Sequence, residues 1–328
     1  MRGRRSVPAA HTIALLAIAS LVGACEPAAG PRLPQAPASP YAPTGAMAAP
    51  GACNLAPTGA LVQRTLVAPG PSSATMARTF QLYVPRGVAA GSSVPLLISL
   101  HGLGANGPVQ NAVTHWSSFD DQLATAGSPF ILALPEGVQT LWFWGLGSSY
   151  DVRFVFDVIA QIRSSRCVDA AQIYVDGWSE GAYMAQRMAC ANEARAVDSK
   201  GIALAAVHGY AGGDPGVIAQ SCRPGPSSAP APSILLSQGL DDTLVNAQQT
   251  GFSAFQAWGM RYACRPPSGS FTAAQQLADC RRSTAVAWWP IDGFGHFTWS
   301  CAADLYWHNR GVWSFLTKGV APTTTTCS

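Results

Sequence analysis

Charged residues are scarce in this 328-residue chain. Only 11% of the residues are Asp, Glu, Lys or Arg, whereas 48% are hydrophobic, and an average domain has roughly a quarter of its residues charged. The hydrophobic fraction is ample for a sizeable core. The surface must therefore be covered largely by Gly, Ser, Thr, Pro and Ala, which suits an exported protein better than a cytosolic one.

An excess of basic residues is also missing from most of the chain. The 20 Lys and Arg exceed the 17 Asp and Glu by three, and Arg2, Arg4 and Arg5 account for the whole difference. No basic footprint of a nucleic-acid-binding protein remains. The nine Cys and six His show no C-x-x-C or H-x-x-x-H spacing, so we expect no metal site.

The N-terminus resembles an export signal. Its arginines precede a short apolar stretch, residues 12–22, which is too short to span a bilayer with these flanks. The stretch ends in Leu-Val-Gly-Ala-Cys25, which is similar to the lipobox of bacterial lipoproteins, and cleavage after residue 24 would leave Cys25 as the lipid anchor. The alternative is a plain secretory signal in which Cys25 is incidental. Residues 25–52 are rich in Ala and Pro and predict an extended tether.

Eight cysteines remain after Cys25, and an even number in an exported chain indicates disulfides. We expect Cys167 to pair with Cys190, because they flank a strand and the helix after it, elements of similar estimated length that run antiparallel. Cys264 with Cys280 is a second expected pair, closing a local loop. The sequence leaves the partners of four others open: Cys53, Cys222, Cys301 and Cys327.

Residues 53–328 alternate apolar runs with segments of helical periodicity, without a break in composition. This alternation predicts one α/β domain with a mostly parallel sheet and helices on both of its faces. Strands are expected at 79–84, 94–100, 130–134, 173–175, 202–207, 234–237 and 284–289, and helices at 111–126, 151–162, 182–190, 247–262 and 304–316.

One of these strands leads into Gly177-Trp-Ser179-Glu-Gly181, followed by a helical segment. A G-x-S-x-G turn between a strand and a helix is typical of a nucleophile elbow, in which glycines let the backbone pass itself. Free amides at the start of the helix favour negative charge near Ser179. The alternative is an ordinary glycine-rich turn.

A nucleophilic serine needs a base and an orienting acid, which follow in that fold in the order Ser, acid, His. After Ser179, Asp241 and Asp242 come directly beyond a strand, although either one alone would more often cap the next helix. His296, in a glycine-flanked loop, is the best candidate base. The HGLG stretch after strand 94–100 predicts an oxyanion hole made by the backbone amides of Leu103 and Glu180.

Taken together, these motifs resemble the polyhydroxybutyrate depolymerase/feruloyl esterase family of secreted α/β-hydrolases, over roughly residues 79–316. The resemblance assigns the acid to Asp242 rather than Asp241. It implies a disulfide-stabilised α/β-hydrolase fold and no metal or organic cofactor. Three positions depart from the family pattern, and each weakens the transfer of substrate preference: Ala182 replaces a glycine, Gln238 replaces a histidine, and Trp299 lies one residue later than usual.

Several tryptophans fall in loops near the predicted strand ends. Core packing is the default role of an aromatic side chain. The alternative is an exposed apolar rim for a hydrophobic polyester or an aromatic acyl group, made by Trp142, Trp144, Trp178 and Trp299.

The sequence therefore predicts an exported serine carboxylic-ester hydrolase that acts on a polyester, on feruloyl or acetyl esters of polysaccharide, or on small esters. Its contact with a membrane would be through the lipid anchor alone, and its oligomeric state stays open. One alternative is a non-catalytic polymer- or glycan-binding lipoprotein that keeps the fold. A peptidase ranks last, because no propeller or cap is present in the sequence.

Overall fold

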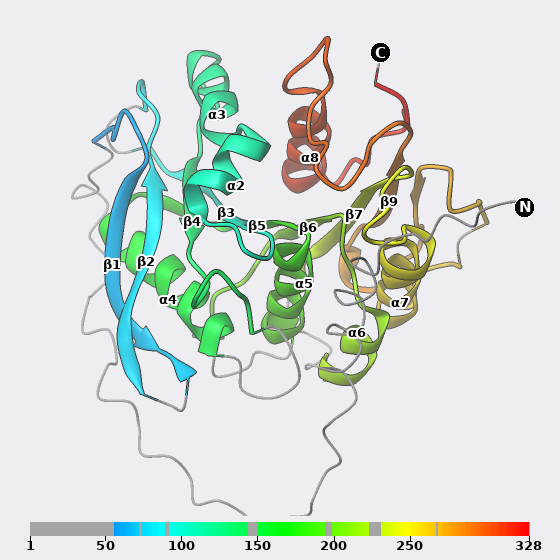
Figure 1. Cartoon of the computed structure of the whole chain (residues 1–328), viewed down its shortest axis with the longest axis horizontal. Helices are drawn as coiled ribbons and strands as arrows, with labels where there is room; N and C mark the ends of the chain where they lie inside the picture. The colour runs from blue at the N-terminus through cyan, green and yellow to red at the C-terminus, as the bar shows by residue number, and fades with distance from the viewer. Residues whose placement is uncertain are drawn as a thin grey trace, which may run out of the picture. The chain divides into compact units, whose positions relative to one another are not determined.

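A nine-stranded β-sheet forms the centre of the computed structural model (Figure 1). The structure describes residues 56–71, 74–88, 92–143, 150–193, 199–222, 231–266 and 268–327. The predicted signal and tether, with Cys25 and Cys53, and Trp144 lie outside the described residues.

The strands follow the order β1-β2-β4-β3-β5-β6-β7-β9-β8. Neighbours from β4 to β9 pair in parallel, whereas β1, β2 and β8 pair antiparallel with their neighbours. The strands are β1 Val62–Pro69, β2 Thr75–Tyr83, β3 Val94–Leu100, β4 Ile131–Pro135, β5 Val168–Trp178, β6 Ala206–Tyr210, β7 Ser233–Gly239, β8 Gln275–Gln276 and β9 Val286–Ile291.

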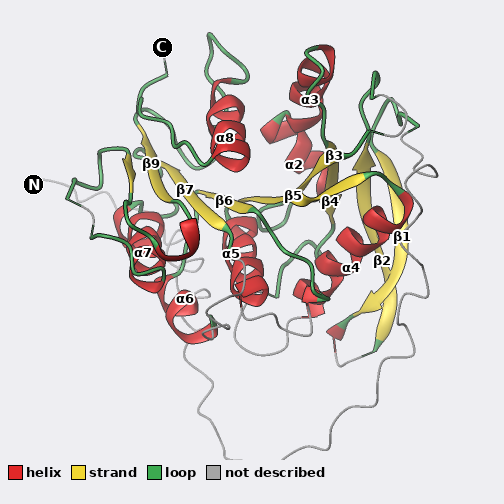
Figure 2. Cartoon of the chain, turned by 180° about the vertical axis from the view of Figure 1, so that it is seen from behind, coloured by secondary structure: helices red, strands yellow, loops and turns green. Residues whose placement is uncertain are grey.

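Helices cover both faces of this sheet (Figures 1 and 2). One face carries α2 Gly107–Thr114, α3 Trp116–Thr125 and α8 Trp307–Lys318. The other carries α4 Tyr150–Ser165, α5 Glu180–Glu193, α6 Pro215–Ser221 and α7 Ser253–Arg261, the last preceded by the π-helical turn Gln248–Phe252. Each face has its own apolar core. The predicted fold class, a mostly parallel sheet covered on both sides, is confirmed.

The elements differ from the predicted ones in a few places. The helix expected at 111–126 is split into α2 and α3, because His115 adopts a left-handed conformation with φ 57°. β5 begins at Val168, five residues before the predicted strand. Strands β1 and β8 and helix α6 were not predicted, since β1 and β8 are edge strands and α6 lies in a Pro/Gly-rich segment.

The predicted pairing of Cys167 with Cys190 is wrong. Cys190, near the end of α5, is bonded to Cys222, and Cys167 is bonded elsewhere. β5 pairs with β3 from Val94 to Leu100 through an irregular stretch between Val168 and Ile173, so β5 covers about the length of the seven residues of β3, ~23 Å at ~3.3 Å each. The helix α5 advances ~16 Å from Glu180 to Cys190 at ~1.5 Å per residue, so Cys190 lies short of the start of the strand. The other predicted pair, Cys264–Cys280, is formed, and so is a further bridge, Cys301–Cys327.

Across the described ranges, no helix is both long and apolar enough to cross a lipid bilayer.

Candidate active site

Four loops that carry the predicted site residues meet at one edge of the sheet. They follow β3, β5, β7 and β9, and these strands run parallel to one another. Parallel strands bring their carboxyl ends to the same edge, where ligands bind in α/β sheets. The topology therefore gathers residues that lie more than a hundred positions apart in the sequence.

Ser179 occupies the tight turn between β5 and α5. It adopts a left-handed backbone conformation with φ 54°, which is costly for a residue with a side chain. A Cβ added at Gly177 would lie 2.1 Å from the Gly181 carbonyl oxygen, and one at Gly181 would lie 2.1 Å from that of Leu100. Neither position can hold another residue. This is the geometry of a nucleophile elbow.

The sequence departs from the family pattern at Ala182, directly after the elbow. Its side chain is buried against β6 and the loop after it. The residues opposite are Gly209 and Gly212, where an added Cβ would lie 3.2 and 3.1 Å from the Ala182 Cβ. The methyl group of Ala182 is therefore accommodated by Gly209 on β6 and Gly212 in the loop after β6, and the elbow keeps its shape.

Ser179, His296 and Asp242 form a continuous chain of hydrogen bonds. The His296 Nε2 atom lies 2.9 Å from the Ser179 Oγ atom, and the Nδ1 atom lies 2.9 Å from Asp242 Oδ2. With Asp242 ionised, Nδ1 carries the proton and Nε2 is free to accept one from the serine. Asp241, the other candidate acid, is exposed and takes no part in this chain.

The Asp242 carboxylate is buried but well supplied with donors. Its Oδ1 atom accepts hydrogen bonds from the backbone amides of Leu244 and Val245, both at 2.9 Å. Burial alone would raise the pKa of Asp242, but the hydrogen bond from His296 and those two amides outweigh it and lower the pKa. The carboxylate is therefore held in its charged form.

Two side chains from the sheet hold the loop of His296. The Trp178 indole N–H donates to the His296 carbonyl oxygen at 2.9 Å, and the Tyr210 hydroxyl donates to the Gly295 carbonyl oxygen at 2.8 Å. Both come from the last residues of adjacent strands, β5 and β6. Two consecutive carbonyl groups of a loop are thus fixed to the rigid sheet. Sequence reasoning had not singled out Tyr210.

The HGLG loop lies directly beside the serine. A Cβ added at Gly102 would lie 3.3 Å from the Ser179 Cβ atom. The His101 ring holds the loop, because its Nδ1–H donates to the Gly102 carbonyl oxygen at 2.8 Å and its Nε2 accepts from the Gly137 amide at 2.9 Å. Burial lowers the pKa of His101 to about 4, so the ring stays neutral and keeps both bonds.

The two predicted oxyanion donors have no competing acceptor. Within the described part of the chain, the amide groups of Leu103 and Glu180 donate to no backbone or side-chain oxygen. Glu180 is the first residue of α5, where the amide has no acceptor inside the helix. Both amides are therefore available to a ligand.

The Glu180 side chain, at the start of α5, is hydrogen-bonded to the loop that carries Trp142 and Phe143. Its carboxylate accepts a hydrogen bond from the Trp142 amide at 3.2 Å, and Asp151 accepts one from the neighbouring Phe143 amide at 2.6 Å. Arg78 is paired with Asp151 at 2.7 Å in the interior. Burial, opposed by the Trp142 amide and assisted by Asp151, raises the pKa of Glu180 to about 7.

The predicted tryptophan rim is wrong. Trp142, Trp178 and Trp299 are all buried, and each indole N–H is bonded inside the protein. Trp144 is outside the described residues. The exposed large apolar side chains on the site loops are instead Leu103, Phe143, Leu244 and Phe297, between 56% and 67% exposed. Leu103 lies within the HGLG loop, and the other three lie one or two residues after Trp142, Asp242 and His296; we call these four side chains the apolar ring.

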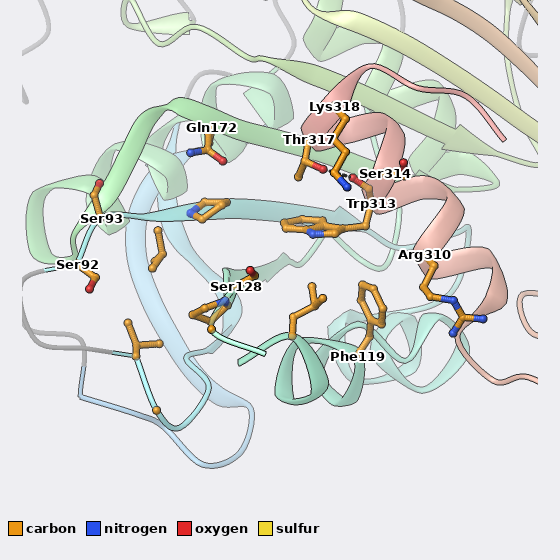
Figure 3. A pocket seen from close by; sticks show the side chains of 17 residues that line it. Ser92, Ser93, Phe119, Ser128, Gln172, Arg310, Trp313, Ser314, Thr317 and Lys318 are labelled. Atoms are coloured by element: carbon orange, nitrogen blue, oxygen red, sulfur yellow. Dashed lines mark hydrogen bonds between the residues drawn. The ribbon is translucent and has the colours of Figure 1, made fainter. Parts of the chain in front are cut away.

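A groove of about 820 Å³ lies at the other edge of the sheet, away from the triad (Figure 3). It runs between α3 and α8 and is lined by Phe119, Trp313, Arg310 and Lys318 among others. Its strand residues, such as Val94, come from the amino-terminal ends. None of the three triad residues lines it.

A second set of polar side chains lies inside the protein, under the site. Asp176 on β5 accepts hydrogen bonds from Ser99 and the Trp116 indole at Oδ2, both at 2.8 Å, and its Oδ1 atom lies 2.7 Å from His208 Nδ1. All four side chains are fully buried. Sequence reasoning missed this cluster because the acid was sought only after Ser179, in the order Ser, acid, His, whereas Asp176 precedes the serine.

The cluster continues across the sheet to α8. His208 Nε2 lies 2.7 Å from the Ser237 Oγ atom, which in turn lies 3.2 Å from His308 Nε2. The Nδ1 atom of His308 has no partner among the described residues. We call Asp176, His208, Ser237 and His308 the buried array.

No group of three or more His, Cys, Asp or Glu in the described ranges is arranged to hold a metal ion. The groups that the structure brings together at the edge of the sheet are the serine, the imidazole, the carboxylate and the two free amides.

Comparison with known proteins confirms the predicted resemblance to feruloyl esterases and related esterases. No family model matches the chain. The chain is 29% identical over 104 residues to the bifunctional acetylxylan esterase/xylanase XynS20E of Neocallimastix patriciarum, and 29% identical over 113 residues to feruloyl esterase B of Piromyces equi. Each match covers 32% of this chain but only 14% and 20% of those relatives.

The fold is found in solved structures as well. The acetyl xylan esterase of Aspergillus awamori superposes with a TM-score of 0.58 at 16% identity, covering 79% of this chain and 99% of that one. Strand order, elbow and superposition together define the α/β-hydrolase fold. Within that class, the curated relatives of this chain are esterases of the acetylxylan and feruloyl type.

Proposed function

We propose that this protein is a serine carboxylic-ester hydrolase with Ser179 as nucleophile, His296 as general base and Asp242 as the orienting acid. The observation that carries the proposal is the chain of two 2.9 Å contacts that starts at a serine with φ 54°. A buried serine in ordinary geometry would not support it, because a nucleophile must meet its substrate as well as its base.

The geometry supports a two-step reaction. Ser179 Oγ attacks the ester carbonyl carbon while its proton passes to His296 Nε2, and the imidazolium then protonates the departing alcohol. Water then attacks the carbonyl carbon of the acyl-enzyme while its proton passes to His296, and His296 returns that proton to Ser179 Oγ as the bond to the serine breaks and the acid leaves. Asp242 stays ionised throughout and stabilises the imidazolium, which agrees with its lowered pKa.

The free amides of Leu103 and Glu180 are proposed to hold the oxyanion of the tetrahedral intermediate. The HGLG loop is fixed to segment 137–142 through His101 and through the Gly104 amide, which donates to the Thr140 carbonyl oxygen at 3.0 Å. Donors that are already in place need no reorganisation as charge develops, and removing one such donor typically costs about 3 kcal/mol of barrier.

We further propose that the acyl group comes from an acetylated or feruloylated polysaccharide, or from a polyester of the polyhydroxybutyrate type. The names of the curated relatives support the first two. The apolar ring supports a hydrophobic acyl group, because exposed apolar side chains that gather around a site mark a binding surface.

Export through the N-terminal signal, with a lipid on Cys25, is proposed as well. The three described disulfides support an oxidising compartment, because such bonds persist outside the cytosol. Labelling growing cells with a radioactive fatty acid tests the anchor, and Cys25→Ser is expected to abolish incorporation.

The decisive experiment compares the mature chain with Ser179→Ala. We expect the unaltered protein to react with a fluorophosphonate probe and to hydrolyse at least one of acetylated xylan, methyl ferulate and hydroxybutyrate oligomers. Ser179→Ala should lose labelling and turnover while keeping its melting temperature. Turnover that survives in Ser179→Ala contradicts the assignment, and binding to a polymer without any release of acid supports a non-catalytic binding protein.

A further inference from the structure

Gln238 stands next to the proposed catalytic acid and takes no part in the mechanism above. It is the penultimate residue of β7 and is fully buried. Its Nε2 atom lies 3.2 Å from Asp242 Oδ2 and 2.6 Å from the Val245 carbonyl oxygen. A buried amide is costly unless its polar atoms are bonded, and here both are.

The orientation of this amide is fixed by its neighbours. A carbonyl oxygen only accepts, so the side-chain atom next to the Val245 carbonyl must be the NH₂ group. The Oε1 atom on the other side accepts from the Thr250 hydroxyl at 3.3 Å. Gly251 packs so closely that an added Cβ would lie 2.6 Å from Oε1. The π-helical turn therefore holds Gln238 against Asp242.

The consequence concerns one oxygen atom of the carboxylate. Oδ1 is held by two backbone amides, whereas Oδ2 receives His296 Nδ1 and one further donor, Gln238. Without Gln238, the imidazole would be the single partner of Oδ2 among the described residues. Fewer hydrogen bonds would then restrain the rotation of the carboxylate about its Cβ–Cγ bond, which sets the direction of Oδ2.

We propose that Gln238 is a positioning residue, whose amide holds the Asp242 carboxylate with Oδ2 directed at His296. This inference rests on the proposed function. The family that the sequence resembles often has histidine at this position. The glutamine supplies a hydrogen-bond donor there instead, so its presence does not indicate the loss of a catalytic site. The amide is neutral at every pH, so it donates to Asp242 under all conditions.

Two substitutions test the inference. Gln238→Met keeps the length of the side chain and removes its polar atoms, and we expect kcat to fall about 10-fold with KM within about twofold, since a hydrogen bond to a charged group is lost. Gln238→Glu keeps the shape and introduces a carboxyl group that, while it is protonated, has one proton to share between Asp242 and the Val245 carbonyl oxygen, and that repels Asp242 once it is ionised.

The pH profile separates positioning from mere packing. For Gln238→Glu we expect kcat/KM near that of the unaltered protein at about pH 6 and roughly 100-fold below it at about pH 9. The titratable groups around the site are Asp242, His296, Glu180 and the buried hydroxyl groups of Tyr183 and Tyr210. Burial raises the pKa of Glu180 to about 7, but Glu180 is present in both proteins, so the ratio of their kcat/KM values at each pH isolates position 238. Burial raises the pKa of Tyr183 to about 12 and that of Tyr210 further still, so neither tyrosine titrates in this range.

Gln110→Met is the matched control. Gln110 is another fully buried glutamine, but its Nε2 atom donates to Ser99, away from the triad. We expect it to lower the melting temperature and to leave kcat and the pH profile unchanged.

Unchanged kcat in Gln238→Met, or a Gln238→Glu profile that superposes on that of the unaltered protein, overturns the inference while the esterase proposal stands. If Gln238→Met does not fold, the profile of Gln238→Glu decides alone. Absence of Ser179-dependent hydrolysis in the unaltered protein would instead reject the proposed function itself.

Discussion

The triad and the buried array contain the same three chemical groups in the same order of contact. In the triad, Ser179, His296 and Asp242 are joined by contacts of 2.9 and 2.9 Å. In the buried array, Ser237, His208 and Asp176 are joined by contacts of 2.7 and 2.7 Å. Distances alone would rank the buried array as the better catalytic triad.

Their surroundings differ in three respects. Ser179 is partly exposed in a left-handed turn, whereas Ser237 is 1% exposed within a regular strand. Free amides lie beside Ser179, whereas the Ser237 hydroxyl is already engaged by a second histidine, His308. Asp176, His208 and His308 of the buried array are 0% exposed, whereas His296 of the triad is 8% exposed. The buried array is a polar network, bonded throughout except at His308 Nδ1, which has no partner among the described residues, and it ties β5, β6 and β7 to α8.

The comparison teaches that hydrogen bonds among a serine, a histidine and an aspartate do not make a nucleophile. A reacting carbonyl also needs access to the hydroxyl and donors for its oxyanion. The same bonds, once enclosed, contribute to stability instead, because each buried polar group must keep its partner.

Removing either serine gives the largest expected contrast. Ser179→Ala should lower kcat by roughly 10⁴- to 10⁶-fold, as when a catalytic nucleophile is lost, with little change in melting temperature. Ser237→Ala should keep kcat within about threefold and lose about 1–3 kcal/mol of unfolding free energy, because His208 loses its partner. Fluorophosphonate labelling with peptide mapping checks both. Labelling at Ser237 would contradict the comparison.

Replacing the two aspartates should give the same contrast as replacing the two serines, with a loss of activity at the triad and a loss of stability in the buried array. Asp242→Asn should lower kcat by about 10³- to 10⁴-fold, because the amide no longer holds His296 in the required tautomer. Asp176→Asn should instead destabilise the fold by about 3–5 kcal/mol, since three donors converge on that buried carboxylate. Urea unfolding measures the loss of stability in both variants, and steady-state kinetics measure the loss of activity. A catalytic defect in well-folded Asp176→Asn would contradict the structural role of Asp176.

The buried array should also make stability depend on pH. Burial, with the neighbouring His208, lowers the pKa of His308 well below its ordinary value. The unfolded chain therefore binds this proton more readily, so the stabilisation is complete above about pH 6.5 and is lost as the pH falls below it, by up to about 1.4 kcal/mol per pH unit.

Urea titrations between pH 8 and 5 measure this slope, and His308→Phe should reduce it by about one proton. His101, whose pKa is lowered to about 4, adds a slope of the same sign, whereas Glu180 and Asp120, whose pKa values burial raises to about 7 and about 8, add slopes of the opposite sign, so the difference between the two proteins is what reports on His308. Equal slopes in the two proteins would show that His308 does not titrate as proposed.

The smallest expected effect concerns the loop of the proposed base. Tyr210→Phe removes the hydroxyl that holds the Gly295 carbonyl oxygen and keeps the ring. We expect kcat to fall about 3- to 10-fold with KM unchanged, because one neutral hydrogen bond is worth about 1 kcal/mol. Tyr262→Phe, whose hydroxyl donates to Pro232 in the core, is the control and should affect stability alone.

The local sequence pattern was enough to predict the features whose structure depends mainly on residues close together in the chain. The apolar run 94–100 became β3 with the predicted ends, and the glycines of the elbow are required by backbone contacts at about 2 Å. The pair Cys264–Cys280 closes a short loop, so its partners were never far apart. For β3, for Gly177 and for Cys264–Cys280 the determining neighbours lie at most 16 residues apart in the chain, whereas Gly181 is also confined by Leu100 on β3.

The failures have a different origin. Cys190 pairs with Cys222 because α6, which the sequence did not predict, packs against α5 and places the residue after it beside Cys190. The tryptophans proved buried because their indole N–H groups found acceptors on other loops, such as the His101 carbonyl oxygen for Trp142. Gln238 appeared in the sequence only as a departure from a pattern.

The sequence by itself determined the α/β class, the elbow around Ser179 and the order in which Asp242 and His296 follow it, because strand periodicity and turn chemistry act over short stretches of chain. Only the tertiary structure decided that those residues meet at one edge, that Ser237, His208 and Asp176 meet in the interior, and which set a substrate can reach. The physical reason is that access and burial depend on which strands become neighbours, and strand pairing joins residues far apart in the chain.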